Sequence, residues 1–155
     1  MAGIVGAVSA IEIRPLTLDD SAAAVGLLVH LNPECPTPVL RERFERILRE
    51  HPHFRALGAY RDGRMVGVAG IWVATKIWCG RYLEIDNLVV HPEHRGTGVG
   101  TALIEHLAGL ARAEHCNLLV LDAYTGNHQS HRLYHRHGFE IWGFHFVRPL
   151  GDLNR

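Results

Sequence analysis

Apolar and polar positions follow two different periods along the first third of the chain, and each period predicts a different element. Alternation over residues 11–14 predicts a short strand, because successive side chains of a strand point to opposite faces. Two stretches with apolar residues at helical spacing follow, one behind the N-cap candidate Thr17 and one over residues 40–48. Prolines interrupt the chain between and after these stretches, so we expect two separate helices.

The middle of the chain has the alternation and the turn signals of an antiparallel β-meander. Strands are predicted over residues 56–60 and 65–74, on either side of Asp62-Gly63, a strong hairpin turn signal. A second turn leads to a strand predicted over residues 81–90. We therefore expect three consecutive antiparallel strands before the pattern changes.

The last third of the chain alternates helices and strands. A glycine-rich loop over residues 95–100 opens an apolar-faced helix, and strand 118–122, helix 127–137 and an aromatic strand over 142–146 are predicted after it. A strand, helix and strand in this order predict parallel pairing through a crossover helix. Together the elements predict an α/β fold with a mixed, mostly antiparallel sheet and helices on both faces. The aromatic residues expected mostly in the core are Trp72, Trp78, Trp142, Phe144 and Phe146.

Length, charge and cysteine usage exclude several classes of protein. The 155 residues fit one domain, residues 1–155, of which residues 1–10 are expected to be poorly ordered. The 16 Lys and Arg balance the 16 Asp and Glu, which gives no reason to expect a nucleic-acid partner. Three scattered cysteines indicate reduced thiols, and no apolar stretch reaches the roughly 18 residues of a membrane span. The start lacks a secretion signal, so we expect a cytoplasmic protein without a membrane partner.

The segment H-P-E-H-R-G-T-G-V-G-T-A-L has the clearest chemical meaning in the chain. Three glycines within five positions, Gly96, Gly98 and Gly100, let the backbone curve closely around a ligand. A helix begins at once, so its free amides and positive dipole end face the loop. With Arg95 at its entrance, the segment predicts a cradle for a pyrophosphate group. A tight strand-to-helix turn without a ligand is the alternative.

A dinucleotide site of the Rossmann type is a second interpretation of the same glycines. Gly96 and Gly98 match the start of G-x-G-x-x-G, and Asp122 follows at about the distance, roughly 20 residues, that this fingerprint requires. The third glycine position, however, is Thr101, and the loop follows an antiparallel meander rather than a first parallel strand. The chain after Asp122 is also too short for the second half of that fold. This interpretation is therefore weak.

Two motifs resemble those of the GNAT N-acetyltransferase superfamily. R-x-x-G-x-G, which begins at Arg95, resembles its acetyl-CoA signature. N-x-x-S-x-x-L-Y-x-x-x-G-F, which begins at Asn127, resembles its closing motif, with Ser130 where alanine is usual. The order of predicted elements also agrees over residues 11–147. The resemblance implies a three-layer α/β/α fold, whose central sheet contains a splayed pair of strands.

The resemblance also implies acetyl-CoA as the co-substrate, and we expect no metal. In the family the strand before the loop separates from its neighbour, and its free backbone amides bind the pantetheine arm and polarise the thioester carbonyl. Asn127 would contact the pantetheine arm, although its position also fits an ordinary helix N-cap. The cofactor-binding residues implied in this way are Leu88, Val89, Val90, Arg95, Gly96, Thr97, Gly98, Val99, Gly100, Thr101, Asn127, Ser130 and Tyr134.

Acetyl transfer to an amine needs a base for the amine and an acid for the departing thiolate, since an alkylamine has a pKa of about 10.4. Glu84 is the candidate base: alternation puts it on one strand face with Asp86, and in the histone-acetyltransferase branch a glutamate at the matching position is the base. Burial and the Asp86 charge would raise the pKa of Glu84. Tyr134 is the candidate acid, because a phenol keeps its proton at neutral pH. The alternatives are carboxylates that solvate a sheet face and a core tyrosine.

These features predict transfer of the acetyl group of acetyl-CoA to a primary amine by direct attack in a ternary complex. The acceptor would be a small-molecule amine, a lysine side chain or a protein N-terminus, bound with help from Asp86. A non-catalytic CoA-binding sensor and transfer of a longer acyl group are the alternatives. The resemblance is compatible with a homodimer. The stripe of His128, His131 and His135 lacks an acidic or cysteine neighbour on its helix, which favours a solvent- or phosphate-facing surface over a metal site.

Overall fold

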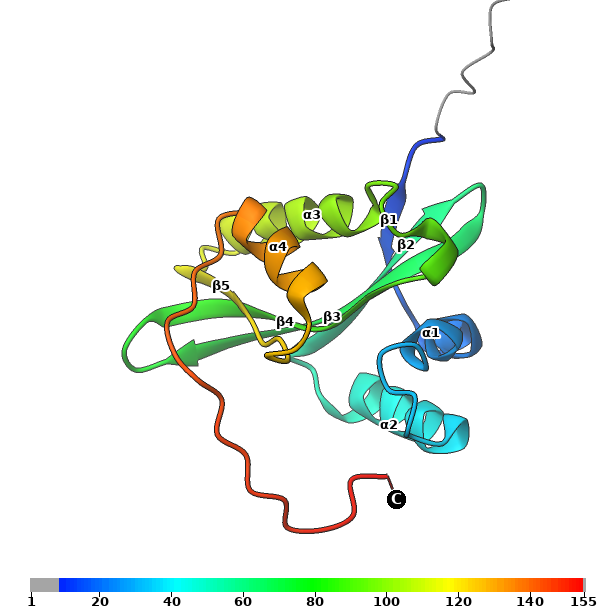
Figure 1. Ribbon diagram of the computed structural model, residues 1–155, viewed down its shortest axis with the longest axis horizontal. Helices are drawn as coiled ribbons and strands as arrows, with labels where there is room; N and C mark the ends of the chain where they lie inside the picture. The colour runs from blue at the N-terminus through cyan, green and yellow to red at the C-terminus, as the bar shows by residue number, and fades with distance from the viewer. Residues whose placement is uncertain (1–8, 155) are drawn as a thin grey trace, which may run out of the picture.

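The structure is a computed structural model that describes residues 9–154, and it consists of one sheet between two layers of helices (Figure 1). Most of the segment expected to be poorly ordered, residues 1–10, lies outside the described residues. The elements in chain order are β1 (Glu12–Pro15), the 3-10 helix η1 (Leu18–Asp20), α1 (Ser21–Leu28), α2 (Thr37–Glu50), β2 (Phe54–Arg61), β3 (Arg64–Lys76), β4 (Gly80–Val90), the 3-10 helix η2 (Pro92–His94), α3 (Val99–Ala113), β5 (Leu118–Leu121) and α4 (His128–Arg136).

The five strands form one sheet in the order β1-β2-β3-β4-β5. The first four strands pair antiparallel, and β4 pairs parallel with β5 across α3, so the predicted mixed and mostly antiparallel sheet is confirmed. The parallel ladder extends only from Tyr82 opposite Leu118 to Ile85 opposite Leu121. Beyond Ile85 the two strands separate, which confirms the splayed pair.

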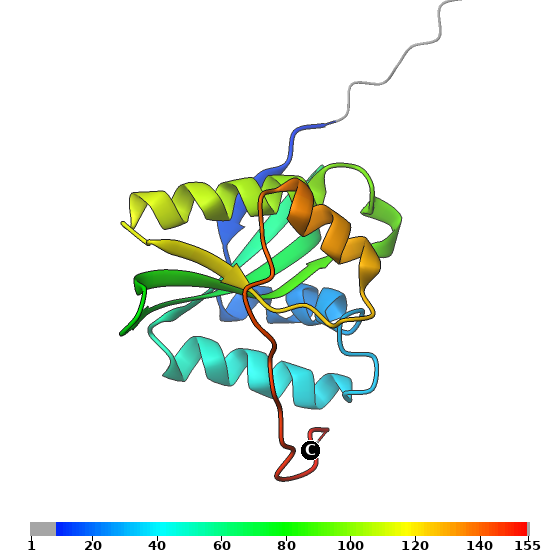
Figure 2. The same ribbon diagram turned by 60° about the vertical axis from the view of Figure 1, so that its left-hand side comes forward.

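Helices cover both faces of the sheet, with α1 and α2 on one side and α3 and α4 on the other (Figure 2). The first face is closed by a core that includes Val25 of α1 and Phe44 of α2, both buried. The second face is closed by the apolar stripe of α3, in which Leu103 and Leu107 are fully buried at the helical spacing read from the sequence. No helix among the described residues has the length and apolar character needed to cross a membrane.

A β-bulge interrupts β4 just before the glycine loop. Its pairing with β3 jumps from Val89 opposite Val68 to Asp86 opposite Gly70, and the intervening Asn87 has a left-handed backbone with φ of 54°. The extra residue changes the alternation of the strand. As a result Asp86 and Val89 both face the α1–α2 side, although they are three positions apart.

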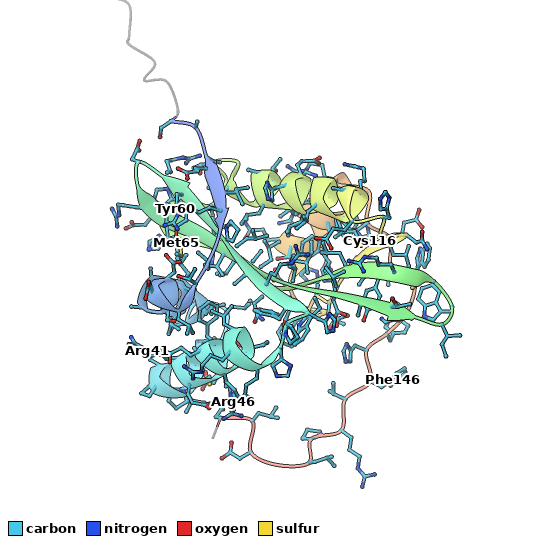
Figure 3. The ribbon with its side chains drawn as sticks, turned by 180° about the vertical axis from the view of Figure 1, so that it is seen from behind. Arg41, Arg46, Tyr60, Met65, Cys116 and Phe146 are labelled. Atoms are coloured by element: carbon cyan, nitrogen blue, oxygen red, sulfur yellow. The ribbon has the colours of Figure 1, made fainter. Side chains whose placement is uncertain are left out.

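The predicted final strand is wrong. After α4 the described chain forms no strand, and Trp142, Phe144 and Phe146 are 71%, 81% and 91% exposed rather than in the core. The segment runs across the end of β5 toward α2 instead of along the strand, and Figure 3 shows Phe146 outside the packed layers. A segment with alternating apolar residues forms a strand only where a neighbouring strand accepts its backbone hydrogen bonds, and this segment has no such neighbour among the described residues. Trp78, at the tip of the β3–β4 hairpin, is also 67% exposed, whereas Trp72 is half-buried.

Candidate active site

The glycine loop lies between η2 and α3 with its backbone shaped for a close approach. Gly96 and Gly98 have left-handed φ values of 72° and 90°, which side chains rarely adopt. A Cβ atom added at either position would meet nothing within 4 Å, so the space in front of the loop is open. Gly98 is the N-cap of α3 and provides no side-chain cap, which leaves the amides of the first helical turn available to an anion. The geometry matches the predicted cradle.

Contacts at both ends attach this loop to the sheet and helices. The Nε atom of Arg95 donates to the carbonyl of Val90, at the end of β4, over 3.3 Å. Thr97 donates from its hydroxyl to the carbonyl of His94 over 2.6 Å. At the other end, a Cβ on Gly100 would lie 3.4 Å from Leu133 of α4. The loop therefore joins β4, α3 and α4 at one place.

The backbone of β4 has an open edge next to this loop. Because β5 pairs with β4 only as far as Ile85, no ladder among the described residues covers residues 86–90 on that side. The side chains of these residues pack inside the protein: Val89 is buried in the α1–α2 core, and Leu88 and Val90 pack against the α3 core. The three predicted residues Leu88, Val89 and Val90 can thus offer their backbone, not their side chains, to a ligand.

Helix α4 carries Tyr134 and reaches the glycine loop through the neighbouring Leu133, which lies 3.4 Å from a Cβ on Gly100. The helix starts at Asn127, whose side-chain oxygen accepts from the amide of Ser130 over 3.2 Å, so Asn127 is an N-cap as the alternative interpretation held. Tyr134 is half-buried and packs edge-on against Phe139, with 5.9 Å between ring centroids. Burial raises the pKa of the phenol, and a hydrogen bond with Ser130 acts in the opposite direction. The phenol therefore stays protonated at neutral pH.

A histidine bridge that sequence reasoning missed fixes α4 on α3. His137, the C-cap of α4, has its Nδ1 atom 2.9 Å from a carboxylate oxygen of Glu105 and its Nε2 atom 3.3 Å from the hydroxyl of Thr101. Its side chain is 10% exposed. The bridge thus links the helix that carries Tyr134 to the first turn of α3. No local pattern in the sequence indicates it, since the partners are more than 30 positions apart.

Glu84 lies on β4 opposite Trp72 of β3 and has an environment suited to a base. Its pKa is raised, chiefly by burial and next by the negative charge of Asp122, with a smaller contribution from Asp86. Lys76 acts in the opposite direction. The predicted increase in pKa is confirmed, but its main charged cause is Asp122 rather than Asp86.

Asp86 and Asp122 have partners of their own. Asp86 accepts a hydrogen bond from the indole nitrogen of Trp72 over 3.3 Å. Asp122, which directly follows β5, lies 2.8 Å from the Nδ1 atom of His145 in the C-terminal segment. The sequence places Asp122 at the carboxyl end of a predicted strand, and this position was the available signal for a functional role. The sequence could not show that Asp122 lies near Glu84, because this depends on the parallel register of β4 and β5.

The family is decided by comparison with known proteins. The sequence model of the Acetyltransferase (GNAT) family matches residues 24–139 of the chain. The chain belongs to the GNAT family. It is accordingly an acetyl-CoA-dependent N-acetyltransferase that acts on an amine acceptor.

Individual GNAT relatives align over nearly the whole chain. Aminoalkylphosphonate N-acetyltransferase of Salmonella typhimurium is 28% identical over 145 residues, which are 90% of this chain and 91% of that one. The crystal structure of ribosomal-protein-alanine N-acetyltransferase from Brucella melitensis biovar Abortus 2308 is 28% identical, covers 92% of this chain and all of its own, and has a TM-score of 0.79. An aminoglycoside N-acetyltransferase in complex with CoA, 23% identical, covers 96% of this chain and 100% of its own with a TM-score of 0.80, and shows the same fold.

The GNAT motif helix also contains the histidine stripe. His131 has its Nε2 atom 2.9 Å from the carbonyl of Tyr124, and His135 has its Nδ1 atom 3.0 Å from the carbonyl of Phe139. His128 packs edge-on against His131. The stripe therefore supports the two turns that flank α4. Within residues 9–154 no group of three or more His, Cys, Asp or Glu side chains is arranged to hold a metal ion.

Proposed function

We propose that this GNAT enzyme transfers an acetyl group from acetyl-CoA to a primary amine by direct attack in a ternary complex, with Glu84 as the base and Tyr134 as the acid. One observation carries the proposal: the open edge of β4 over residues 86–90 continues the strand of Glu84 and ends at the glycine loop. In that loop a Cβ on Gly100 would contact both Val90 of β4 and Leu133 of the helix that carries Tyr134. A thioester bound along that edge would lie between the two proton-transfer groups.

The residues around the loop fit a bound acetyl-CoA. The amides of the first turn of α3 and the backbone over residues 95–98 face open space and would hold the pyrophosphate. Backbone amides of β4 over residues 88–90 would bind the pantetheine arm and stabilise negative charge on the thioester oxygen. Acetyl-CoA supplies a carbonyl carbon activated toward nucleophiles by its thiolate leaving group.

Glu84 takes the proton that the amine must lose. Its raised pKa, from burial and from the Asp122 charge, makes the carboxylate a stronger base than an exposed glutamate. As the amine nitrogen bonds to the carbonyl carbon, the C–S bond breaks and the nitrogen's proton passes to Glu84, directly or through a water.

Tyr134 donates its phenolic proton to the departing sulfur, which leaves as a thiol. Burial keeps this proton on the oxygen at neutral pH. The proton that Glu84 gained returns to solvent, and Tyr134 takes one back before the next cycle, so the transfer is balanced. Truncation of either side chain should therefore lower kcat by about 100-fold, the lower range for a positioned acid or base.

The charges at the site favour an acceptor that is cationic. Glu84, Asp86 and Asp122 bring three carboxylates together, with Lys76 and His145 as the nearby basic groups. The acceptors for which the relatives are named, an aminoalkylphosphonate, a ribosomal-protein alanine and an aminoglycoside, differ in charge. The three carboxylates suit an acceptor with a second positive charge, such as a diamine, an aminoglycoside or a lysine-containing peptide, better than an aminoalkylphosphonate, whose phosphonate group is negative.

Thiol release from acetyl-CoA tests the function against a panel of these four amine types. We expect turnover with at least one cationic acceptor, intersecting double-reciprocal lines as in a ternary complex, and large losses of kcat in Glu84→Gln and Tyr134→Phe. Glu12→Gln on the far edge of the sheet and Tyr60→Phe at the end of β2 are the matched controls and should retain wild-type rates. Parallel lines, or variants as active as the controls, would contradict the proposed mechanism, and faster turnover with propionyl-CoA than with acetyl-CoA would contradict the acyl group.

A further inference from the structure

Arg61, the last residue of β2, reaches from the β2–β3 hairpin to the glycine loop. Its Nη1 atom donates to the hydroxyl of Thr97 over 2.8 Å, and its Nη2 atom donates to the carbonyl of Thr97 over 3.0 Å. One guanidinium thus binds both the side chain and the backbone of a single loop residue, 36 positions away. Neither the loop motif nor the closing motif includes Arg61.

Thr97 is the residue at which the loop most needs support. It lies between Gly96 and Gly98, both left-handed and both exposed. Glycines lose more conformational freedom on ordering than any other residue, so a loop with two of them is costly to fix in one shape. The hydrogen bond from Thr97 to His94 is local to the loop. Among the contacts of the described residues, those from Arg61 attach Thr97 to the sheet.

The environment of Arg61 also argues for a role beyond general stability. Its Nε atom is buried and has no hydrogen-bond partner among the described residues. A buried donor without an acceptor is unfavourable, so the side chain is held in this position at a free-energy cost while its two Nη atoms reach Thr97. A lysine in its place would keep the charge but lose the planar fork that binds two acceptors at once.

We propose that Arg61 is a positioning residue for acetyl-CoA: it holds the backbone over residues 95–98 in the shape that receives the pyrophosphate before the ligand arrives. The inference rests on the proposed cofactor site. Preorganisation of a loop lowers the ordering cost that binding must otherwise meet. Loss of Arg61 should therefore weaken acetyl-CoA binding, while leaving the proton-transfer groups on β4 and α4 in place.

Calorimetric titration with CoA and steady-state kinetics test this role on the intact chain. In both Arg61→Lys and Arg61→Gln we expect the Kd for CoA and the KM for acetyl-CoA to rise about tenfold, with kcat at saturating acetyl-CoA within about twofold of wild type. Arg64→Gln is the matched control, since the exposed Arg64 lies opposite Arg61 in the same hairpin. It should bind CoA as the wild type does.

Four results would overturn the inference, each in a different way. Wild-type affinity in both Arg61 variants would show that the loop needs no support from β2. Weak binding in Arg61→Gln with wild-type binding in Arg61→Lys would assign the effect to charge alone. Failure of the unaltered protein to bind CoA would remove the cofactor site itself. If the Arg61 variants do not fold, Thr97→Val, which removes one acceptor of the guanidinium, should weaken CoA binding, and wild-type affinity in that variant would also overturn the inference.

Discussion

Two carboxylates near Glu84, those of Asp86 and Asp122, both raise its pKa. Glu84 and Asp86 come from β4, whereas Asp122 follows β5 and is brought near by the parallel pairing of the strands. Two basic side chains act in the opposite direction on this pKa: Lys76, at the end of β3, and His145, in the C-terminal segment. The pKa of Glu84 is thus set by residues from four parts of the chain, which allows its main charged causes to be tested separately.

Substitutions of Asp122 and Lys76 should move the acidic limb of the pH–rate profile in opposite directions. A base is active when ionised, so activity rises with pH through the pKa of Glu84. Asp122→Asn removes a charge that raises this pKa and should shift the limb to lower pH, while Lys76→Gln should shift it to higher pH. The measurement is kcat/KM for the amine from pH 5 to 10. Shifts of the same sign would show that the limb belongs to another group.

Among single residues, those that lie inside a local pattern could be predicted from the sequence. Tyr134 and the glycine loop were predicted because they belong to short local motifs, and Glu84 was predicted from strand alternation and from its matching position in the family. Their roles stay predictions until they are measured. Arg61 and His137 could not be found in this way. Their partners, Thr97 for one and Thr101 and Glu105 for the other, are more than 30 positions distant and become neighbours only in the folded chain.

The bulge in β4 lies in the part of the strand that leads to the glycine loop. Asn87 adopts a left-handed backbone there, which asparagine tolerates better than most side chains do. The extra residue turns Val89 into the α1–α2 core. The edge of β4 that faces β5 is open just before the loop, because the β4–β5 ladder ends at Ile85. A β-branched residue at position 87 would oppose this conformation.

Asn87→Val should therefore lower the free energy of unfolding by about 1–2 kcal/mol, the cost of a left-handed backbone for an ordinary residue. It should also reduce acetyl-CoA affinity, because the strand edge beside the loop is disturbed. Asn87→Gly, which permits the same φ, is the control and should remain close to wild type in both respects. Urea unfolding and CoA titration provide the two measurements. Equal stability of the two variants would show that the backbone at this position is not under constraint.

Most elements were predictable, and the exception has a physical reason. The meander followed from alternation and from the Asp62-Gly63 turn, and α3 followed from its apolar stripe, because these signals are local. The segment over residues 142–146 has the same alternation but no strand to pair with. Its path is set instead by contacts to other elements, from His145 to Asp122 and from Arg43 to the carbonyl of Leu153.

Two glutamates contribute to the free energy of unfolding with opposite pH dependence. Glu114, just after α3, is bound by Arg55 of β2 and Arg81 of β4, and the hydrogen bond with Arg55 is the chief cause of its lowered pKa. It therefore stabilises the fold above the ordinary value of 4.5, and this stabilisation is lost as pH falls. Glu84 has a raised pKa, so its contribution is present below 4.5 and is lost as pH rises through its folded value.

The two glutamine variants should therefore change stability in opposite directions at pH 8. Glu114→Gln breaks an ion-pair network that joins α3 to the sheet and should lower the free energy of unfolding by about 1 kcal/mol. Glu84→Gln removes a carboxylate that is poorly solvated when ionised, so it should be at least as stable as wild type although it is nearly inactive. The difference for Glu84→Gln should disappear toward pH 4, because the Glu84 carboxyl is then protonated in the folded protein. The difference for Glu114→Gln should only begin to shrink there, since the pKa of Glu114 in the folded protein lies below 4.5. Urea unfolding at the two pH values provides the measurement, and a destabilised Glu84→Gln at pH 8 would mean that Glu84 supports the fold instead of being retained for its chemistry.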